Sequence, residues 1–534
     1  MNRIAAYINR HIDGVAFSDQ RILEPFSGDR SPLRFSPRVL VFPSHTADLV
    51  SLVRFSAQLA QRKLYLPITV RSGGTSHNGA PLSEGMLIST KNLHHIKELD
   101  LRQRLVRVEA GITLGALNQA LATHGLFLPV LGHENATIGG LIATCAPASD
   151  NTTPATIIDF VSDLEVVLAN GELAHFSNGN LKKALSQNHA AVAPFLQNLD
   201  HTLKQHQETL VSLPSPLECK AHYPGLFYFK DGKSFPVSAL FAGSEGSLGL
   251  ISEVILRLEP VFSAPSYLAI PCASPQNFAL ALQALKDAHF TDLKLFDRHF
   301  FNQGESNGKD SSFFRSDDGQ GYVLIASAKD DTIHARRRKL KRLTRTLPGH
   351  FRLISAAPGD KLYHEFERTD SFVKAYLNDN SAGLYHFPIL EGIFIPPDQQ
   401  AKFLSGLDLI AKRLKLNLPV TGRPDFNLFS LHPTFNITSA SGRNRLIEVV
   451  SHCLTLITAC QGHLCGASPE GRFHALFIKN QTTADTIQLE KAVKQSLDPK
   501  NIFNPYLKSA ATNAKVLSHL RTAAPEGPTD LTCI

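Results

Sequence analysis

The sequence contains no tryptophan, two methionines and only seven cysteines in 534 residues. The cysteine count is odd, no C-x-x-C pair occurs, and the one close group is Cys453, Cys460 and Cys465. Zinc ribbons and iron–sulfur sites need closely spaced cysteines, and disulfide-stabilised domains are small and rich in them. The composition therefore excludes all three classes.

Long apolar runs are also missing. The best candidate for a membrane span, Leu446–Cys460, carries Glu448 and His452, and the N-terminal segment MNRIAAYINRHIDG has no apolar core of a signal peptide. The net charge of +7, from 54 basic and 47 acidic residues, is too dilute to indicate a nucleic-acid partner. We expect a soluble, cytoplasmic protein that binds no nucleic acid.

The sequence does have ample apolar material, with 43% hydrophobic residues spread over a length typical of two or three domains. Apolar periodicity and turn residues predict alternating strands and helices up to Pro260. The expected strands are 39–42, 65–70, 105–109, 164–168, 173–176, 239–241 and 251–258, and the expected helices begin at the caps Thr46 and Thr113. No internal sequence repeat is visible.

From Tyr267 the pattern is strand, helix, strand, strand, helix, strand, which is typical of a ferredoxin-like sheet. A second round of strands and helices follows from residue 386. We predict helices at 276–288, 332–346, 398–413, 441–460 and 484–497, strands at 292–296, 322–326, 351–354, 386–396, 416–421 and 426–431, a polar loop at 302–321, and a loose tail from 509. The fold class is α+β.

The segment RSGGTSHNG (Arg71–Gly79) combines three glycines with hydroxyl, amide and guanidinium donors. Glycines let backbone N–H groups approach an anion closely, so this chemistry suits a pyrophosphate. The G-x-G-x-x-G spacing of a Rossmann site is absent, and an ordinary glycine-serine turn is the alternative.

Three further segments stand out. In ATIGGLIATCA (136–146) paired glycines in a β-branched run indicate a strand backbone pressed against a flat ligand, or a tight bend. GSEGSLGLISEVILRLEP (243–260) places three glycines and Glu245 before an alternating strand, and DPKNIFNP (498–505) is a rigid turn after a helix. Taken singly, the last two are explained by a hairpin turn and a helix stop.

Together the four segments resemble the vanillyl-alcohol-oxidase/p-cresol-methylhydroxylase (PCMH) type of FAD-binding flavoprotein, and more narrowly the branch of D-lactate, glycolate and D-2-hydroxyglutarate dehydrogenases. The resemblance runs from about Ser18 to Lys508 and includes VEAGITLGALNQALATHGLFLP, ATIGG, LEVVLANGE and GSEGSLGL. It implies an N-terminal lead-in (1–35), a two-subdomain FAD-binding domain (36–263), a cap with a ferredoxin-like antiparallel sheet (264–490), a return to the FAD domain (491–510) and a loose tail (511–534).

The resemblance also implies which residues hold FAD. These are Arg71, Ser72, Gly73, Gly74, Thr75, Ser76, Asn78, Gly79, Thr137, Ile138, Gly139, Gly140, Thr144, Glu245, Gly246, Gly249, Leu250, Asn504 and Lys508. Some relatives attach FAD covalently through a histidine directly after the paired glycines. Thr75 stands there, so we expect non-covalent FAD, with His77 as an ordinary loop histidine.

Two motifs of the hydroxy-acid branch are broken. TGRPDFNLF (421–429) has Gly422 and Phe429 where the family's metal-binding histidines stand, and GASPEGR (466–472) has Ala467 and Ser468 in place of Glu and His. Glycine, phenylalanine and alanine cannot ligate a divalent ion or accept a proton near neutrality. We therefore expect no metal, although His432, His463 and His474 lie nearby in sequence.

Two hypotheses follow. In the first, the protein is an FAD-linked oxidase or dehydrogenase with a remodelled pocket. It oxidises a small hydroxylated substrate, a 2-hydroxy acid among the options, and transfers hydride to flavin N5. Arg423 and Arg472 would clamp an anionic substrate, and Glu470 or a cap Tyr or His would be the base. In the second, the chain is a flavin-binding subunit or regulatory relative that has lost this chemistry.

Electrons leaving the flavin would need an external acceptor, which is oxygen, a quinone or a separate redox protein, because the sequence shows no second redox centre. The basic stretch RRRKLKRLTR (336–345) fits a solvated helix face or an acidic or lipid partner. Membrane contact is therefore expected to be peripheral at most, at the inner face of a membrane.

Overall fold

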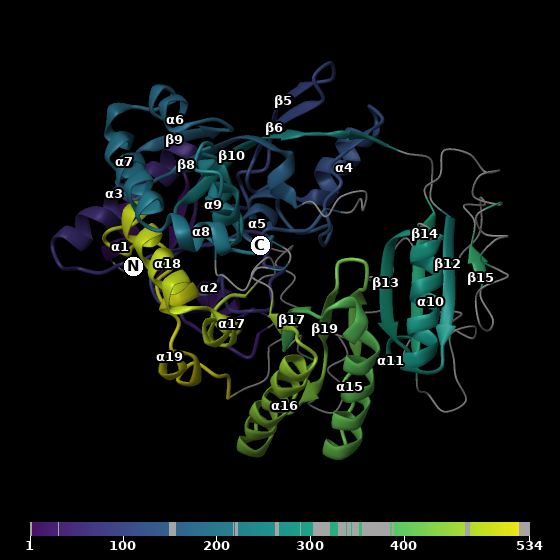
Figure 1. The fold of residues 1–534 in the computed structure, drawn as a ribbon. Coiled ribbons are helices and arrows are strands. Elements are labelled where there is room, and N and C mark those ends of the chain that lie inside the picture. Colours follow the sequence, from purple (N-terminus) through teal and green to yellow (C-terminus); the bar gives the residue numbers. More distant parts are fainter. Residues whose placement is uncertain are drawn as a thin grey trace.

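The computed structural model describes residues 3–29, 31–148, 156–216, 218, 223–261, 266–288, 290–302, 321–328, 338, 343, 352–354, 385–386, 389–464 and 470–522. Figure 1 shows a first region that spans residues 3–261 and, beside it, a cap that begins at residue 266. A C-terminal segment, residues 475–522, returns from the cap to the first region.

The first region begins with a four-stranded sheet in the order β1-β2-β4-β3, in which β2, β4 and β3 run parallel. Its strands are β1 (Val15–Phe17), β2 (Val39–Phe42), β3 (Ile68–Arg71) and β4 (Met86–Ser89), and its helices are α1 (Arg3–Ile8), α2 (Gln20–Leu23) and α3 (Thr46–Gln61). Leu49, Leu52, Val53 and Ala57 form the buried face of α3 at helical spacing and pack on the sheet. This helix is capped at His45, one residue before the predicted Thr46.

A second sheet of the first region is antiparallel, in the order β5-β6-β10-β8-β9. Its strands are β5 (Ile96–Asp100), β6 (Leu105–Glu109), β8 (Val161–Val167), β9 (Leu173–Ser177) and β10 (Leu250–Arg257), with β7 (Leu126–Phe127) pairing β11 (Glu259–Pro260). Gly171 makes the predicted tight turn between β8 and β9 with φ of +78°. Helices α4 (Leu114–Ala122), α5 (Ile138–Ala143), α6 (Leu181–Gln187), α7 (Ala193–Gln205), α8 (Gln207–Ser212) and α9 (Val237–Phe241) complete this part.

The cap is built on an eight-stranded antiparallel sheet in the order β15-β12-β14-β13-β18-β19-β17-β21. The elements in chain order are β12 (Ser266–Cys272), α10 (Pro275–Asp287), β13 (Thr291–Asp297), α11 (His299–Asn302), β14 (Tyr322–Ala328), β15 (Arg352–Ile354), β16 (Tyr385–His386), β17 (Leu390–Phe394), α15 (Gln400–Leu414), β18 (Val420–Arg423), β19 (Leu428–Leu431), β20 (Thr434–Phe435), α16 (Ala440–Ala459) and β21 (His463–Leu464). Numbered within each half, the strands follow the order 4-1-3-2, so two ferredoxin-like halves meet edge to edge where β13 pairs with β18.

The repeated strand order agrees with the predicted second round of strands and helices, and the sequence itself shows no repeat. The predicted loop 302–321, apart from its end residues, lies outside the described residues. So does the predicted helix 332–346 with its basic stretch, apart from Arg338 and Leu343.

The C-terminal segment contains α17 (Ala475–Gln481), α18 (Ala484–Leu497) and α19 (Asn513–Leu517). Helix α18 packs on α7 of the first region, as Figure 1 shows. Val516 lies in a buried cluster with Leu33 and Phe35, and the Arg521 guanidinium donates to the carbonyls of Leu33 and Asp29. The prediction of a loose tail is therefore wrong for residues 511–522, because they cover the lead-in segment.

Two predicted strands are helices. Residues 138–143 form α5, because the Thr137 side chain accepts a hydrogen bond from the Gly140 amide and caps a helix. Residues 237–241 form α9, where the predicted strand 239–241 lies. Both are short, mostly apolar runs, in which periodicity does not separate a buried helix from a buried strand.

Candidate active site

A cavity of about 820 Å³ lies between the first region and the cap. The first region contributes the 72–77 loop, the 131–137 loop, α5 and the segment 244–251. The cap contributes β13, β17, β18 and β19 around the seam between its two halves. The cavity is of the size that buries a cofactor together with a small ligand, and the segments 71–79, 136–146 and 243–260 all reach its wall.

The glycine-rich loop sits where two backbones nearly touch. A Cβ at Gly73 would lie 2.2 Å from the carbonyl oxygen of Asn135, so only glycine fits there. Gly74 has a φ of +64°, and Ser72, Thr75 and Ser76 add side-chain hydroxyls to the cavity wall. The loop thus presents backbone amides and hydroxyls without any carboxylate of its own, which suits a phosphate.

Helix α5 and the 244–251 segment form a further part of this wall. A Cβ at Gly139 would lie 2.7 Å from Ala110 Cβ, so this glycine allows close packing of α5 on the second sheet. Glu245 and Gly246 both have left-handed backbone, with φ of +48° and +70°. No atom lies within 4 Å of a Cβ built on Gly246, which lines the cavity, so this position leaves room for a ligand.

Arg71 supplies a further sign that a ligand belongs here. Its side chain is 1% exposed, and its Nη1 donates to Gly28 O at 2.8 Å. Its Nε and Nη2 are buried and find no acceptor among the described residues, and Nη2 lies 3.3 Å from the Cβ position of Gly74. Buried guanidinium donors are normally satisfied, so an anionic group at the glycine loop fits this side of the cavity.

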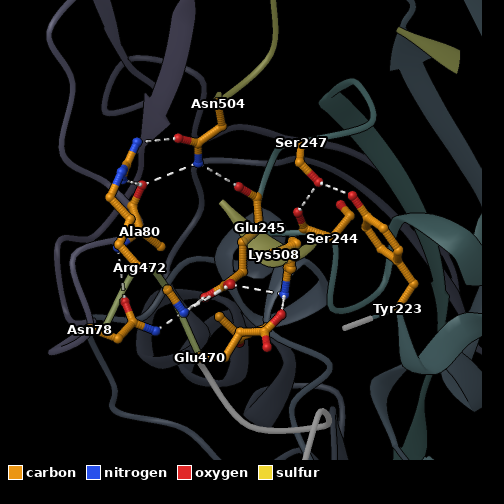
Figure 2. Close-up of polar contacts among 12 residues, drawn as sticks. Asn78, Ala80, Tyr223, Ser244, Glu245, Ser247, Glu470, Arg472, Asn504 and Lys508 are labelled. Atoms are coloured by element: carbon orange, nitrogen blue, oxygen red, sulfur yellow. Dashed lines mark hydrogen bonds and ion pairs between the residues drawn. The ribbon is translucent and has the colours of Figure 1, made fainter. Parts of the chain in front are cut away.

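Behind the 244–246 turn lies a buried network that joins four distant segments (Figure 2). The Lys508 ammonium forms ion pairs with Glu245, at 2.9 Å, and with Glu470. Asn78 Nδ2 donates to Glu245 Oε1 at 3.1 Å, and Asn504 Nδ2 donates to the Glu245 carbonyl at 2.9 Å. The network thus holds the glycine loop, the 244–246 turn, the end of the cap and the C-terminal segment together.

Burial and the neighbouring charges together shift the pKa values of Lys508 and Glu245 in this network. The Lys508, Glu245 and Glu470 side chains are at most 2% exposed. Burial alone would lower the pKa of Lys508, but the two carboxylates outweigh it and raise that pKa. Burial raises the pKa of Glu245, the nearby Glu470 raises it further, and Lys508 offsets only part of this. The ammonium is therefore firmly charged and is the counter-ion for two carboxyl groups.

The cap wall of the cavity carries its own charged groups. Arg423 on β18 is ion-paired with Asp292 at 3.1 Å and Asp425 at 3.2 Å, and it lies over the Phe426 ring. Glu391 on β17 faces His77 of the glycine loop, with 3.6 Å between Oε1 and Nδ1. His77 and Glu391 therefore join the two regions across the cavity.

Many of the residues predicted to hold the cofactor do line the cavity. They are Ser72, Gly73, Gly74, Thr75, Ser76, Thr137, Gly139, Gly140, Thr144, Glu245, Gly246, Gly249 and Leu250. Arg71 lies under the loop, and Ile138 is buried in the core of the first region. Asn78, Gly79, Asn504 and Lys508 lie in or beside the network behind the cavity.

The residues predicted for catalysis do not come together. Arg423 lines the cavity, but two carboxylates already occupy its guanidinium. Glu470 is paired with Lys508, and Arg472 donates to Asn504 Oδ1 at 2.7 Å and to the carbonyls of Gly79 and Ala80. Arg472 lines a separate cavity of about 160 Å³. These contacts leave Glu470 poorly placed as a base and Arg472 poorly placed as a substrate clamp.

In the segment TGRPDFNLF (421–429), an apolar contact stands where the family's metal-binding histidines are expected. Gly422 and Phe429 are paired across β18 and β19, and a Cβ on Gly422 would lie 2.8 Å from the Phe429 ring. The Phe429 ring is buried in the cap core, so an apolar contact occupies the place of two ligands. Within the described part of the chain, the one group that could hold a metal is Asp13, His45 and Asp48, in the first region. Ala467 and Ser468 lie outside the described residues.

Sequence reasoning missed the pair of His77 and Glu391. His77 was interpreted as a loop histidine, and Glu391 falls inside a predicted apolar strand. One signal was present, because a lone carboxylate in the run PILEGIFIPP is costly to bury without a partner. The partner itself, more than 300 residues away, is visible only in the fold.

Comparison with known families agrees with this arrangement. Residues 37–177 match the family described as FAD binding domain, and residues 263–507 match the family described as FAD linked oxidases, C-terminal domain. The chain belongs to the FAD-linked oxidases of the PCMH type. The glycine loop, the orphaned Arg71 donors and the open position at Gly246 fit FAD as the cofactor.

Relatives of this FAD-linked oxidase include D-2-hydroxyglutarate dehydrogenase of Haemophilus influenzae, which is 23% identical over 525 residues, or 93% of this chain and 50% of that protein. A glycolate oxidase subunit of Bacillus subtilis is 21% identical over 493 residues, covering 90% of this chain and 91% of the relative. The chain spans about half the length, or less, of the D-2-hydroxyglutarate dehydrogenases that it matches.

Solved structures show the same fold. The 4-ethylphenol oxidase from Gulosibacter chungangensis superposes with a TM-score of 0.67 at 14% identity, covering 95% of this chain and 96% of that one. An alkyldihydroxyacetonephosphate synthase gives a TM-score of 0.62 at 16% identity, over 92% of this chain and 83% of that one. Among the residues described, no helix has the length and apolar character needed to cross a membrane.

Proposed function

We propose that this FAD-linked oxidase removes hydride from a carbon that bears a hydroxyl group in a small substrate, and that the reaction takes place in the 820 Å³ cavity. The observation that carries the proposal is the cavity itself. It joins the glycine loop of the first region to polar residues on β17, β18 and β19 of the cap. A cofactor held at one wall is thereby exposed to a substrate bound at the other.

The residues of the first region would hold FAD without a covalent bond. Hydroxyls and amides of the 72–76 loop and the Arg71 guanidinium suit its pyrophosphate, and Gly140 and Gly246 leave room for its flat parts. When bound, the flavin supplies a two-electron acceptor. We propose the domain limits 36–263 for the FAD domain and 264–490 for the cap.

On the substrate side we propose a pocket without a metal. The apolar contact between Gly422 and Phe429 fills the place of the family's ligands, while Thr421, Arg423 and Ser430 provide polar groups at the cavity wall. Arg423 keeps one guanidinium nitrogen, Nη1, outside its ion pairs with Asp292 and Asp425. This leaves room for hydroxylated substrates with or without a carboxylate, and 2-hydroxy acids are among them.

Reoxidation of the flavin is proposed to use an acceptor outside the chain. The four buried cysteines of the described part are free thiols that do not converge, so they supply no second redox centre there. Oxygen, a quinone and a separate redox protein are the candidates, and the ratio of reoxidation rates with oxygen and with a soluble quinone would rank the first two.

The decisive experiment mixes the FAD-loaded protein, without oxygen, with D-lactate, glycolate, D-2-hydroxyglutarate, glycerol and xylitol, and follows the visible flavin absorbance. Bleaching by one of them supports the proposal. The flavin content is measured first, so that a lack of cofactor is not mistaken for a lack of reaction. Full occupancy with no bleaching by any compound would favour a flavin-binding subunit that has lost the chemistry.

A further inference from the structure

We infer that His77 is the proton acceptor of the oxidation and that Glu391 orients it, an inference that rests on the proposed function. His77 belongs to the glycine loop and Glu391 to β17, and both line the cavity. Their side chains are 20% and 17% exposed, and 3.6 Å separates His77 Nδ1 from Glu391 Oε1. The pair therefore stands where the cofactor wall and the substrate wall meet.

Oxidation of an alcohol requires a base. The carbinol C–H bond breaks and its electron pair leaves as hydride to the bound FAD, the O–H bond breaks, and the C–O bond becomes a carbonyl. The O–H proton must go to a group in the cavity, and His77 would accept it at Nε2 and then release it to solvent. An imidazole is suited to this task because its ordinary pKa lies near neutrality.

Glu391 would select the correct tautomer of His77. A carboxylate facing Nδ1 favours the proton on that nitrogen, which leaves the Nε2 lone pair free to accept a proton and stabilises the imidazolium that results. No described residue forms a hydrogen bond with His77 Nε2. The 3.6 Å separation closes to a hydrogen bond with a small side-chain rotation, and such contacts often tighten only when substrate is bound.

Glu391 is available for this role. Its Oε2 is buried and accepts no hydrogen bond from any described residue. Burial alone would raise its pKa, but His77, followed by His474 and His432, outweighs burial and lowers that pKa. Glu391 therefore carries its negative charge at neutral pH, as the orienting partner of a base must.

The other imidazoles nearby are occupied or unsuited. His432 is buried and contacts Thr421 Oγ1 at 2.8 Å, and burial lowers its pKa to about 4. His474 contacts the Ile389 carbonyl at 2.8 Å through Nε2. His133, in the cavity wall, accepts a hydrogen bond from the Asn135 amide. The charged groups of the same wall are Glu134, Glu245, Lys294, Glu391 and Arg423, and of these Glu391 is the one ion-paired with His77.

The kinetic test compares the FAD-loaded protein with its variants His77→Gln and Glu391→Gln, using whichever compound of the five-member panel bleaches the wild type. We expect the bleaching rate at saturating substrate to fall about 100-fold or more in His77→Gln and about tenfold in Glu391→Gln. The matched controls are His452→Gln and Glu448→Gln on α16, outside the cavity wall, which should react like the wild type. Added imidazole should restore part of the rate in a His77→Ala variant.

A second readout needs no turnover. Proton–carbon spectra of protein labelled in its histidine rings, recorded from about pH 5 to about pH 9, would follow the His77 ring, assigned by its loss in His77→Gln. At the alkaline end of this range, Glu391→Gln should lower the share of His77 rings that are protonated on Nδ1, which the ring-carbon shifts report, and Glu448→Gln should leave that share unchanged.

The outcomes are distinguishable. Wild-type bleaching rates in FAD-loaded His77→Gln would overturn the base assignment while leaving the proposed function intact. A share of Nδ1-protonated His77 that is the same in Glu391→Gln and in the wild type would overturn the orienting role of Glu391. A wild type that no compound bleaches at full FAD occupancy would overturn the proposed function, and the base assignment would fall with it.

Discussion

His432 makes the stability of the cap depend on pH at the scale of a single residue. Its side chain is 5% exposed, and burial lowers its pKa to about 4 from an ordinary value near 6.5. When the pH is lowered, His432 is therefore protonated in the unfolded chain at a higher pH than in the folded chain. Its contribution to the free energy of unfolding is present above the unfolded pKa and is lost as the pH falls from about 6.5 toward about 4.

We predict that this histidine accounts for about 2 kcal/mol of stability lost between about pH 7 and about pH 5. Urea unfolding of the wild type and of His432→Gln at both pH values measures it, because the variant has no proton to take up. His452→Gln, on the accessible side of α16, is the control. An equal loss in His432→Gln and in the wild type would contradict the prediction.

Thr75 underlies a second prediction at this scale. Its hydroxyl stands directly after Gly73 and Gly74 in the cavity wall and cannot form the bond to flavin that a histidine forms. Precipitating the FAD-loaded protein with acid should therefore leave all the yellow colour in the supernatant. Colour that stays in the pellet would show covalent attachment through another side chain and would direct attention to His77, two residues further on.

Residue identities alone indicated the cofactor wall better than the substrate wall. Gly73 and Gly139 are needed because two backbones approach too closely for a Cβ, and such glycines mark their positions in the sequence itself. Arg423, Glu470 and Arg472 were chosen for charge near the broken motifs. Their partners, Asp292, Lys508 and Asn504, come from other segments and are known only after folding.

At the scale of elements, α5 combines two neighbouring glycines with different tasks. Gly139 faces Ala110 of the second sheet, where a Cβ would lie 2.7 Å from Ala110 Cβ and 2.9 Å from its carbonyl oxygen. Gly140 lines the cavity, and a Cβ there would meet the Thr137 hydroxyl at 3.0 Å and no backbone atom within 4 Å. One glycine therefore serves packing and the other leaves space for the cofactor.

We predict that Gly139→Ala destabilises the FAD-free protein by about 1–3 kcal/mol, because the sheet and helix must separate. Gly140→Ala should change that stability by less than about 1 kcal/mol, since alanine favours a helix, yet it should weaken FAD binding. Urea unfolding without FAD and fluorescence titration with FAD measure the two effects. The reverse order of stabilities would show that the two roles are misassigned.

The elements themselves were largely predictable. Strand β2, helix α18 and the βαββα order of the second cap half, from β17 to α16, follow from apolar periodicity and turn residues. Helices α5 and α9 were not predicted. A short apolar run has too few polar positions to show whether its periodicity is that of a helix or of a strand. The edge-to-edge joining of the halves through β13 and β18 is a long-range pairing that local sequence does not encode.

At the scale of the whole molecule, Lys508 links the first region to the end of the cap through buried ion pairs. Its ammonium is shared by Glu245 of the first region and Glu470 at the end of the cap, and all three side chains are buried (Figure 2). Removing one partner from a buried ion network leaves the others uncompensated in a medium that solvates charge poorly.

We predict that Lys508→Met lowers the free energy of unfolding by about 3–5 kcal/mol near neutral pH. The loss should shrink as the pH falls, because burial favours the neutral form of a carboxyl group once Lys508 is absent, so Glu245 and Glu470 then take up protons. Urea unfolding at about pH 7.5 and about pH 5 measures this, with Lys491→Met on the exposed side of α18 as control. A variant as stable as the control would show that the network contributes little.

The sequence by itself determined the cofactor fold of this protein, since glycine positions, turn residues and apolar periodicity are local properties that act over a few residues. It also predicts, from the residues at 422, 429, 467 and 468, that the family's metal ligands are missing. Only the tertiary structure decided which charges meet: Lys508 with two carboxylates, Arg423 with two aspartates, and His77 with Glu391 across the cavity. Coulomb energies depend on distance and burial, and both arise only when segments hundreds of residues apart are folded together.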